Sequence, residues 1–138
     1  MKTMLAFIII VFSAFCYFAW LYTMPNVTYT DKDLFKYYLL TFSEIKNAPR
    51  LSEDYYFEYG PSDESDPQES IMYTCGLSNI DEGYAKLLSY VKGTGKTLSA
   101  GYAWDNPPKR GDEYFFLSKT SLRGGEECLI LSFSKEAK

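Results

Sequence analysis

Histidine is absent from the 138-residue sequence, and this absence narrows the chemistry open to the protein. Histidine is the usual base that activates a serine or cysteine nucleophile, and it is a common metal ligand. The three cysteines do not replace it, because no two of them form a Cys-x-x-Cys pair. Acidic residues are plentiful, but their densest group lies in a polar segment. A catalytic acid–base pair needs one carboxyl group with a raised pKa, and nothing in such a segment is expected to raise it. The sequence therefore predicts no enzyme, no metal site and no cofactor.

Charge is absent from residues 4–22, MLAFIIIVFSAFCYFAWLY, which contain a single serine. Nineteen such residues are long enough to cross a bilayer core of roughly 30 Å as a helix. A cleaved signal peptide is the alternative, but its apolar core is usually about 7–15 residues and a small-x-small site follows. Here the end of the run, residues 20–25, is bulky, and Phe15 before Cys16 does not fit a lipoprotein signal. We expect residues 1–24 to be a retained signal-anchor, with Trp20 at the interface.

The charges around this run predict its orientation. Lys2 is the only charged residue before the run, and Asp31, Lys32 and Asp33 follow it. The positive-inside rule then places the N-terminus in the cytoplasm. We expect a single-pass membrane protein with a short tether at 25–30 and a periplasmic, or otherwise extracytoplasmic, domain at 31–138.

The cysteines fit an exported domain. Cys16 lies in the apolar run, where it is expected to be a small apolar side chain. Cys75 and Cys128 remain as an even pair and predict a disulfide, worth about 4 kcal/mol by the loop-entropy model. The alternative is two unrelated buried thiols.

Hydrophobic periodicity predicts two helices in the domain. The first begins near a Thr30–Asp33 capping box, runs to about Ala48 and is stopped by Pro49. The second begins at a Ser78–Asp81 box and ends at Gly93 and Gly95. Their expected apolar faces are, in order, Leu34, Tyr37, Tyr38, Thr41, Phe42 and Ile45, then Ile80, Tyr84, Leu87, Leu88 and Val91.

Alternation and turn residues predict strands between and after the helices. The expected strands are 54–60, 71–75, 97–104, 113–118 and 128–134, with loops at 61–70 and 105–112. Short connections between successive strands favour antiparallel pairing. The sequence therefore predicts an α+β domain with an antiparallel sheet of about five strands and two helices, in the order α-β-β-α-β-β-β.

One segment, residues 52–70 (SEDYYFEYGPSDESDPQES), holds seven carboxylates and no basic residue. Residues 31–70 carry ten acidic and four basic side chains, whereas residues 71–138 carry eight and nine. This local acidity argues against nucleic-acid binding. The acids also lack the spacing of a calcium loop, since Pro67 interrupts them.

Two interpretations of the acidic segment remain open. It is either a solvated hairpin tip that keeps an aromatic edge soluble, or a recognition surface for a cationic partner. Strand alternation puts Tyr55, Phe57 and Tyr59 on one face and Tyr56 and Glu58 on the other. On the second interpretation, the partner-binding residues are Tyr56, Glu58, Asp63, Glu64, Asp66 and Glu69.

These features favour a binding function. We expect a membrane-anchored extracytoplasmic binding protein whose partner is a basic protein, for example an inhibitor or immunity protein that neutralises it. An accessory subunit of a membrane or envelope complex is the first alternative, although the apolar run has no charge and no Gly-x-x-x-Gly. A small enzyme or a solute-binding domain is the second.

Overall fold

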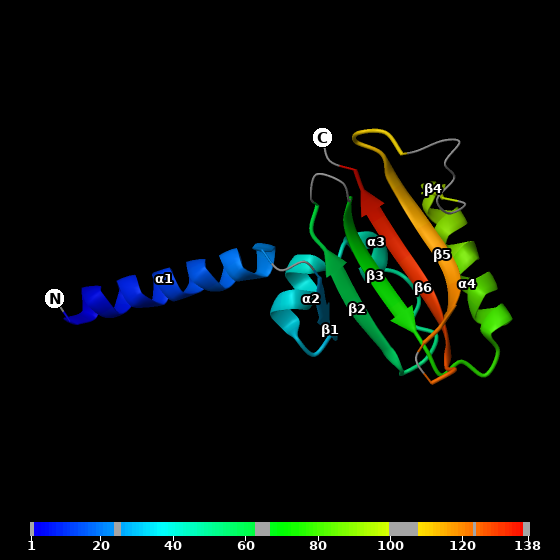
Figure 1. Cartoon of the computed structure of the whole chain (residues 1–138), viewed down its shortest axis with the longest axis horizontal. Coiled ribbons are helices and arrows are strands. Elements are labelled where there is room, and N and C mark those ends of the chain that lie inside the picture. Colours follow the sequence, from blue (N-terminus) through cyan, green and yellow to red (C-terminus); the bar gives the residue numbers. More distant parts are fainter. Residues whose placement is uncertain (1, 24–25, 63–66, 100–107, 123, 137–138) are drawn as a thin grey trace.

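The computed structural model describes residues 2–23, 26–62, 67–99, 108–122 and 124–136 (Figure 1). Within these residues the chain forms an α+β structure with four helices and a sheet of six strands. In chain order the elements are α1 (Lys2–Thr23), β1 (Val27–Tyr29), α2 (Leu34–Leu40), α3 (Ser43–Lys46), β2 (Tyr55–Gly60), β3 (Gln68–Thr74), α4 (Ile80–Thr94), β4 (Thr97–Leu98), β5 (Glu113–Ser121) and β6 (Glu127–Lys135).

The apolar N-terminal run is helical, and it projects away from the sheet as α1 (Figure 1). Its window Thr3–Trp20 is long and apolar enough to cross a membrane, and none of that window is buried against the rest of the chain. An isolated apolar helix of this kind would expose a large hydrophobic surface in water. The helix therefore fits the predicted anchor, by length and composition.

The sheet is mixed, with the strand order β1-β2-β3-β6-β5-β4. Every neighbouring pair is antiparallel except β4 and β5, which run parallel. The sequence predicts an antiparallel sheet throughout, and the β4–β5 pair corrects this. The connection at 99–112 is long enough to return the chain to the same end of the sheet, as a parallel neighbour requires.

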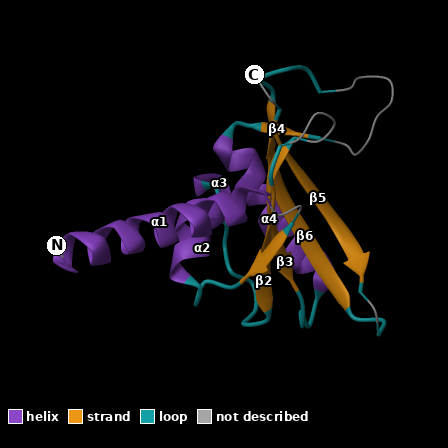
Figure 2. Cartoon of the chain, turned by 60° about the vertical axis from the view of Figure 1, so that its left-hand side comes forward, coloured by secondary structure: helices purple, strands orange, loops and turns teal. Residues whose placement is uncertain are grey.

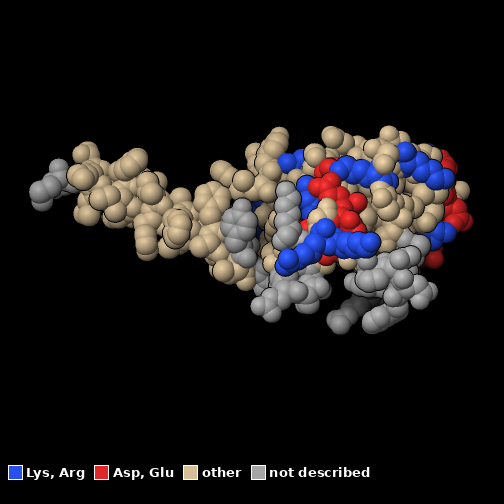
Figure 3. Space-filling model, turned by 90° about the horizontal axis from the view of Figure 1, so that it is seen from above, with Lys and Arg blue, Asp and Glu red and all other residues tan. Residues whose placement is uncertain are grey.

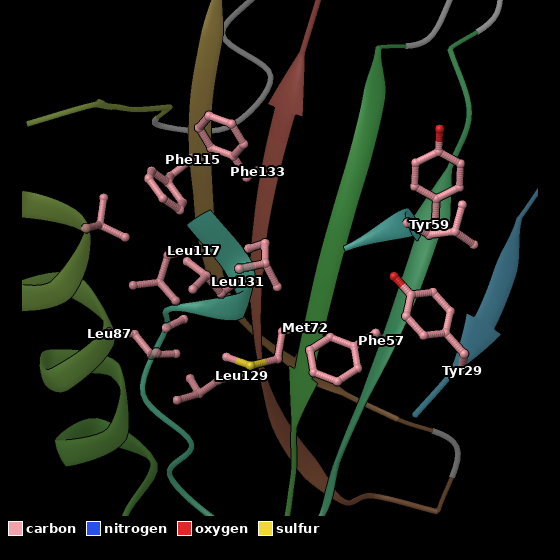
Figure 4. Close-up of a cluster of buried hydrophobic side chains, with 14 of the residues drawn as sticks. Tyr29, Phe57, Tyr59, Met72, Leu87, Phe115, Leu117, Leu129, Leu131 and Phe133 are labelled. Atoms are coloured by element: carbon pink, nitrogen blue, oxygen red, sulfur yellow. The ribbon is translucent and has the colours of Figure 1, made fainter. Parts of the chain in front are cut away.

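Alternation along the strands divides the sheet into two faces. One face packs against α2, α3 and α4, and we call it the helix-side face (Figures 1 and 2). Its core includes side chains from four central strands and from the helices (Figure 4). Fully buried members are Phe57, Met72, Leu129, Leu131, Phe133, Phe115, Leu87 and Ile45.

The first predicted helix is two helices, because the backbone is extended at Thr41 (ψ 124°). The Thr41 hydroxyl lies 2.8 Å from the hydroxyl of Tyr29 in β1, and this buried contact holds the break in place. The predicted apolar face is therefore divided. Ile45 is buried, but Leu34 and Tyr38, which were expected in the core, are 61% and 67% exposed.

Residues 27–29 lie in the predicted tether, yet they form strand β1 at the edge of the sheet. Val27 pairs with Tyr59 and Tyr29 pairs with Phe57, and both β1 side chains are buried. The sheet thus has one strand more than the sequence predicts. An alternation of buried and exposed side chains cannot be recognised from three residues of sequence. The strand structure of these residues therefore depends on their pairing with β2.

Several strand limits also differ from the expected ones. β3 begins at Gln68, so Glu69 is a strand residue and not part of the predicted 61–70 loop. β4 is described only at Thr97–Leu98, and residues 100–107 of the predicted 97–104 strand and 105–112 loop lie outside the described residues. The second domain helix is capped by Asn79 rather than Ser78. It ends at Thr94, with Gly95 in a left-handed conformation (φ 71°) as its C-cap, whereas Gly93, which was also expected to end it, lies within the helix.

Cys75 and Cys128 lie opposite one another, one position beyond the Thr74–Leu129 pair that ends the β3–β6 ladder, with their Cα atoms 4.3 Å apart. Their sulfur atoms are 2.08 Å apart, which is the distance of a disulfide. Both side chains are buried. The link joins the two central strands directly, across 53 positions of sequence.

Candidate functional site

The second face of the sheet carries no helix in the described part of the chain, and we call it the open face (Figures 1 and 2). Strand register sets out its side chains in rows across β2, β3, β6 and β5. The central row is Glu58, Ile71, Ser132 and Phe116; the rows beside it are Tyr56, Tyr73, Ile130 and Ser118, and Gly60, Glu69, Ser134 and Tyr114.

This face is richer in large side chains than a solvated sheet face needs to be. Antiparallel sheets with one wet face usually alternate apolar residues inside with polar residues outside. Here three of the outward positions are aliphatic or phenyl side chains, and three are tyrosines, all half-buried. They are Ile71, Ile130, Phe116, Tyr56, Tyr73 and Tyr114. Contiguous surfaces of this kind are typical of protein contacts.

Tyr56 and Tyr73 form the aromatic centre of one row. They are direct cross-strand partners, and their rings stack with centroids 4.6 Å apart and planes 8° from parallel. Burial raises the pKa of Tyr73 to about 12, and the negative charge of Glu58 adds to the effect. The pKa of Tyr56 is raised for the same reasons, with burial first and Glu58 second. Both hydroxyls therefore stay protonated at neutral pH, and they lie in a negative field.

Charge is distributed unequally between the two faces of the strands. Alternation places Glu58 and Glu69 on the open face, whereas the strand lysines Lys119 and Lys135 lie on the helix-side face. Lys119 pairs with Asp81 of α4, and Lys135 lies 4.7 Å from the ring of Phe42. In the described strands the open face consequently bears carboxylates without a basic side chain.

The two carboxylates of the open face have polar partners but no basic partner among the described residues. Asn26 Nδ2 donates to Glu58 Oε1 over 2.9 Å, and Ser134 Oγ donates to Glu69 Oε1 over 3.3 Å. These neutral contacts orient the side chains without cancelling their charge. Both acids therefore keep an uncompensated negative charge beside the aromatic rows.

The upper end of the sheet is different, because its charges are paired. Lys96 Nζ lies 2.7 Å from Glu113 and 3.2 Å from Glu44. Lys135 adds a second cation 3.6 Å from Glu113. Figure 3 looks onto this end and shows basic and acidic side chains interleaved. Uncompensated charge thus distinguishes the open face from this neighbouring surface.

Two serines of β6, Ser132 and Ser134, lie on the open face, and both are buried. Ser132 lies between Ile71 and Phe116 of the neighbouring strands and is buried. Its hydroxyl has no hydrogen-bond partner within the residues that the structure describes. The Thr74 hydroxyl, on the helix-side face, also has no partner among the described residues, so this feature does not distinguish the two faces.

The predicted partner-binding residues divide into two groups. Tyr56, Glu58 and Glu69 come together on the open face. Asp63, Glu64 and Asp66 lie outside the described residues. The sequence prediction did not include Ile71, Tyr73, Tyr114, Phe116 and Ile130, although the alternation within 71–75 and 113–118 is a signal that both faces of these strands carry large side chains.

Two other features of the domain do not form a site. Cys75, Glu126 and Cys128 lie within 4.8 Å of one another, but cysteines at disulfide distance offer no thiolate to a metal. A hollow of about 90 Å³ at the beginning of α4 is lined by residues such as Asn79 and Lys86. Pockets for small molecules are usually about 300 Å³ or larger.

No protein-family model matches the sequence, and no curated protein and no solved structure matches the chain.

Proposed function

We propose that this chain is a membrane-anchored extracytoplasmic binding protein, and that its open face receives a basic protein partner. The observation that carries the proposal is the acidic and aromatic open face itself. Tyr56 and Tyr73 offer a broad stacked surface, and Glu58 and Glu69 border it without a basic neighbour among the described residues. Neutralising a basic protein, as an inhibitor or immunity protein does, is the concrete role that this chemistry fits.

The surface chemistry supports a protein partner in two ways. Tyrosine gives a large contact area with a hydrogen-bonding tip, and it is enriched at protein interfaces. Uncompensated carboxylates accelerate the approach of a basic partner and disfavour an acidic one. The acidic residues Asp63, Glu64 and Asp66 follow β2 in sequence and would add to the same negative field.

The proposed orientation rests on the charges around α1. Lys2 precedes the apolar helix, so the N-terminus is proposed to be cytoplasmic and the domain extracytoplasmic. An oxidising compartment also suits the Cys75–Cys128 pair, since disulfides persist outside the reducing cytosol. The domain would then meet its partner at the membrane surface.

The experiment is site-specific photo-crosslinking in the cells that make the protein. A photoreactive phenylalanine analogue replaces Tyr56 on the open face, and in a matched control it replaces Ser89, an exposed residue of α4. The proposal expects one crosslinked protein from position 56, with an excess of lysine and arginine, and none from position 89. Adding Glu58→Gln and Glu69→Gln to the position-56 protein should reduce the yield several-fold.

Two outcomes would contradict the proposal. Equal crosslinking from positions 56 and 89 would show that the open face has no preference for a partner. A captured protein that is acidic, with a yield unaffected by the Glu58→Gln and Glu69→Gln changes, would show that charge does not select it.

A further inference from the structure

The short helix α2 has a second apolar face that no described part of the chain covers. Tyr37 and Leu40 point to the core. Among the described residues after Thr23, large apolar side chains are exposed at five positions. One is Leu98, which is 36% exposed, and the other four belong to α2. These four are exposed by 53–70%: Leu34, Phe35, Tyr38 and Leu39. A surface helix that is apolar on both sides requires a second apolar neighbour.

The position of α2 identifies that neighbour. Figures 1 and 2 both place α2 beside the end of α1 that joins the domain. Only four peptide steps separate Thr23, the last residue of α1, from Val27, the first residue of β1. Such a segment spans at most about 14 Å, so the edge of the domain that carries β1 stays close to the end of α1.

We propose that the exposed face of α2 lies in the interfacial layer of the bilayer that α1 crosses, as a second membrane contact. This inference rests on the anchoring part of the proposed function. The residues exposed on α2 (Leu34, Phe35, Tyr38 and Leu39) are of the kinds that bury in the boundary between headgroups and acyl chains. α2 thereby holds the domain at a fixed height and tilt on the membrane.

The polar groups around α2 fit a boundary between lipid and water. Lys46 Nζ donates to the carbonyl oxygen of Tyr38 over 2.9 Å and lies 5.3 Å from the Tyr38 ring. Lys36 lies 3.0 Å from Asp33 at the beginning of the helix. Lysines commonly extend along apolar surface and keep their ammonium group in the headgroup layer. A second copy of the chain would also cover α2, but it would not account for the position of α2 beside α1.

The contact also gives the open face a defined orientation. α2 and the open face belong to different sides of the sheet, because α2 packs on the helix-side face through Leu40. Seating α2 in the interface therefore leaves Tyr56 and Tyr73 free for a partner. Two membrane contacts, α1 and α2, restrict rotation of the domain more than α1 alone would.

The experiment uses the full chain with Cys16→Ser, so that an engineered cysteine is the one free thiol. Spin labels are placed singly at Phe35→Cys, Leu39→Cys, Phe12→Cys in α1 and Ser89→Cys in α4, all at exposed positions. The proteins are reconstituted in phosphatidylcholine vesicles that contain a minority of phosphatidylglycerol. Collision rates with oxygen, which concentrates in lipid, and with a water-soluble nickel complex give the depth of each label.

The inference expects position 12 to report the bilayer interior, positions 35 and 39 the interface, and position 89 water. Labels at 35 and 39 that match position 89 while position 12 reports the interior would overturn the inference and leave the anchor intact. Dipolar broadening between labels at 35 in dilute vesicles would show that a second copy covers α2, which also overturns it. A label at 12 that reports water would overturn the anchor of the proposed function itself.

Discussion

Phe115 and Phe116 are neighbours in β5, and they lie on opposite faces of the sheet. Phe115 has no exposed surface, and its ring centroid is 4.8 Å from that of Phe133 in the helix-side core. Phe116 lies half-buried on the open face, opposite Ser132. The pair therefore allows the same substitution to test both faces of one strand.

Phe115→Ala should lower the free energy of unfolding by about 3–5 kcal/mol, because it removes a fully buried ring and leaves a cavity. Phe116→Ala should lower it by less than about 1.5 kcal/mol, since an outward ring contributes mainly cross-strand contacts. Denaturant unfolding of both variants in the same detergent measures the difference. Equal losses would mean that the open face is covered in the isolated protein.

The pH dependence of stability should report Tyr73. Its pKa is raised to about 12 by burial and by Glu58, whereas an unfolded tyrosine titrates near 10. The folded state then holds the proton more tightly, so this stabilisation is complete below about pH 10 and is lost between about pH 10 and 12. The free energy of unfolding should fall over that window, and less steeply for Tyr73→Phe.

Tyr29 and Tyr114 also have pKa values raised to about 12, so part of the alkaline loss should remain in Tyr73→Phe. Burial is the first cause for both, and a hydrogen bond to Glu136 adds to it for Tyr114. An equal fall in the free energy of unfolding of wild type and Tyr73→Phe between about pH 10 and 12 would show that Tyr73 does not contribute to this loss.

The disulfide should be present in the protein isolated from cells. Thiol labelling of the unfolded, unreduced chain should find Cys16 alone, because Cys75 and Cys128 are at bonding distance. Replacing both by alanine should lower the free energy of unfolding by about 4 kcal/mol, since the link closes a loop of about fifty residues. Three labelled thiols would show that the domain is held by its core alone.

The chain should remain full length in the membrane, with its domain outside. In the Cys16→Ser background, an impermeant maleimide should label Ser89→Cys in intact spheroplasts and Thr3→Cys, which keeps Lys2, only after lysis, as the positive-inside rule requires. Terminal sequencing and fractionation provide the check on cleavage. A soluble protein that begins near Met24 or Asn26 would contradict the anchor.

The parts of the fold predicted well are those with a long local signal. The second domain helix shows Leu87 and Val91 on its buried face, and glycine ends it, so short-range periodicity was sufficient. The strands 54–60 and 128–134 were found because aromatic and aliphatic residues mark them. In these segments local preference and the tertiary structure agree.

The parts predicted poorly depend on contacts between distant residues. The extended backbone at Thr41, which divides the first helix, is held by the hydroxyl of Tyr29, and β1 is too short to be recognised without its pairing to β2. The parallel β4–β5 pair follows from a long connection whose path the sequence does not specify. Tertiary context decides such elements over local propensity.

Only part of the candidate site can be predicted from the sequence, because the rest depends on contacts between distant residues. Alternation was enough to separate Tyr56 and Glu58 from Phe57. The sequence does not specify the register between strands. This register places Tyr73 opposite Tyr56 and Glu69 opposite Ser134. A surface made from four strands becomes visible only when their pairing is known.

The central claim concerns charge on the open face, and one rate measurement tests it most directly. The partner captured from position 56 is purified, and its association rate is measured against salt concentration for wild type and for Glu58→Gln/Glu69→Gln. The matched control is Glu53→Gln/Glu82→Gln, which removes two exposed carboxylates elsewhere. Neutral amides at the two exposed control positions should alter folding little.

The account predicts that wild type and the control associate fastest at low salt, and that the open-face variant is several-fold slower there. The difference should shrink at high salt, where screening already weakens the attraction. A further change of Asp63, Glu64 and Asp66 to amides should slow association again. Rates for the open-face variant that equal those of wild type at every salt concentration would contradict the claim that this face receives a basic partner.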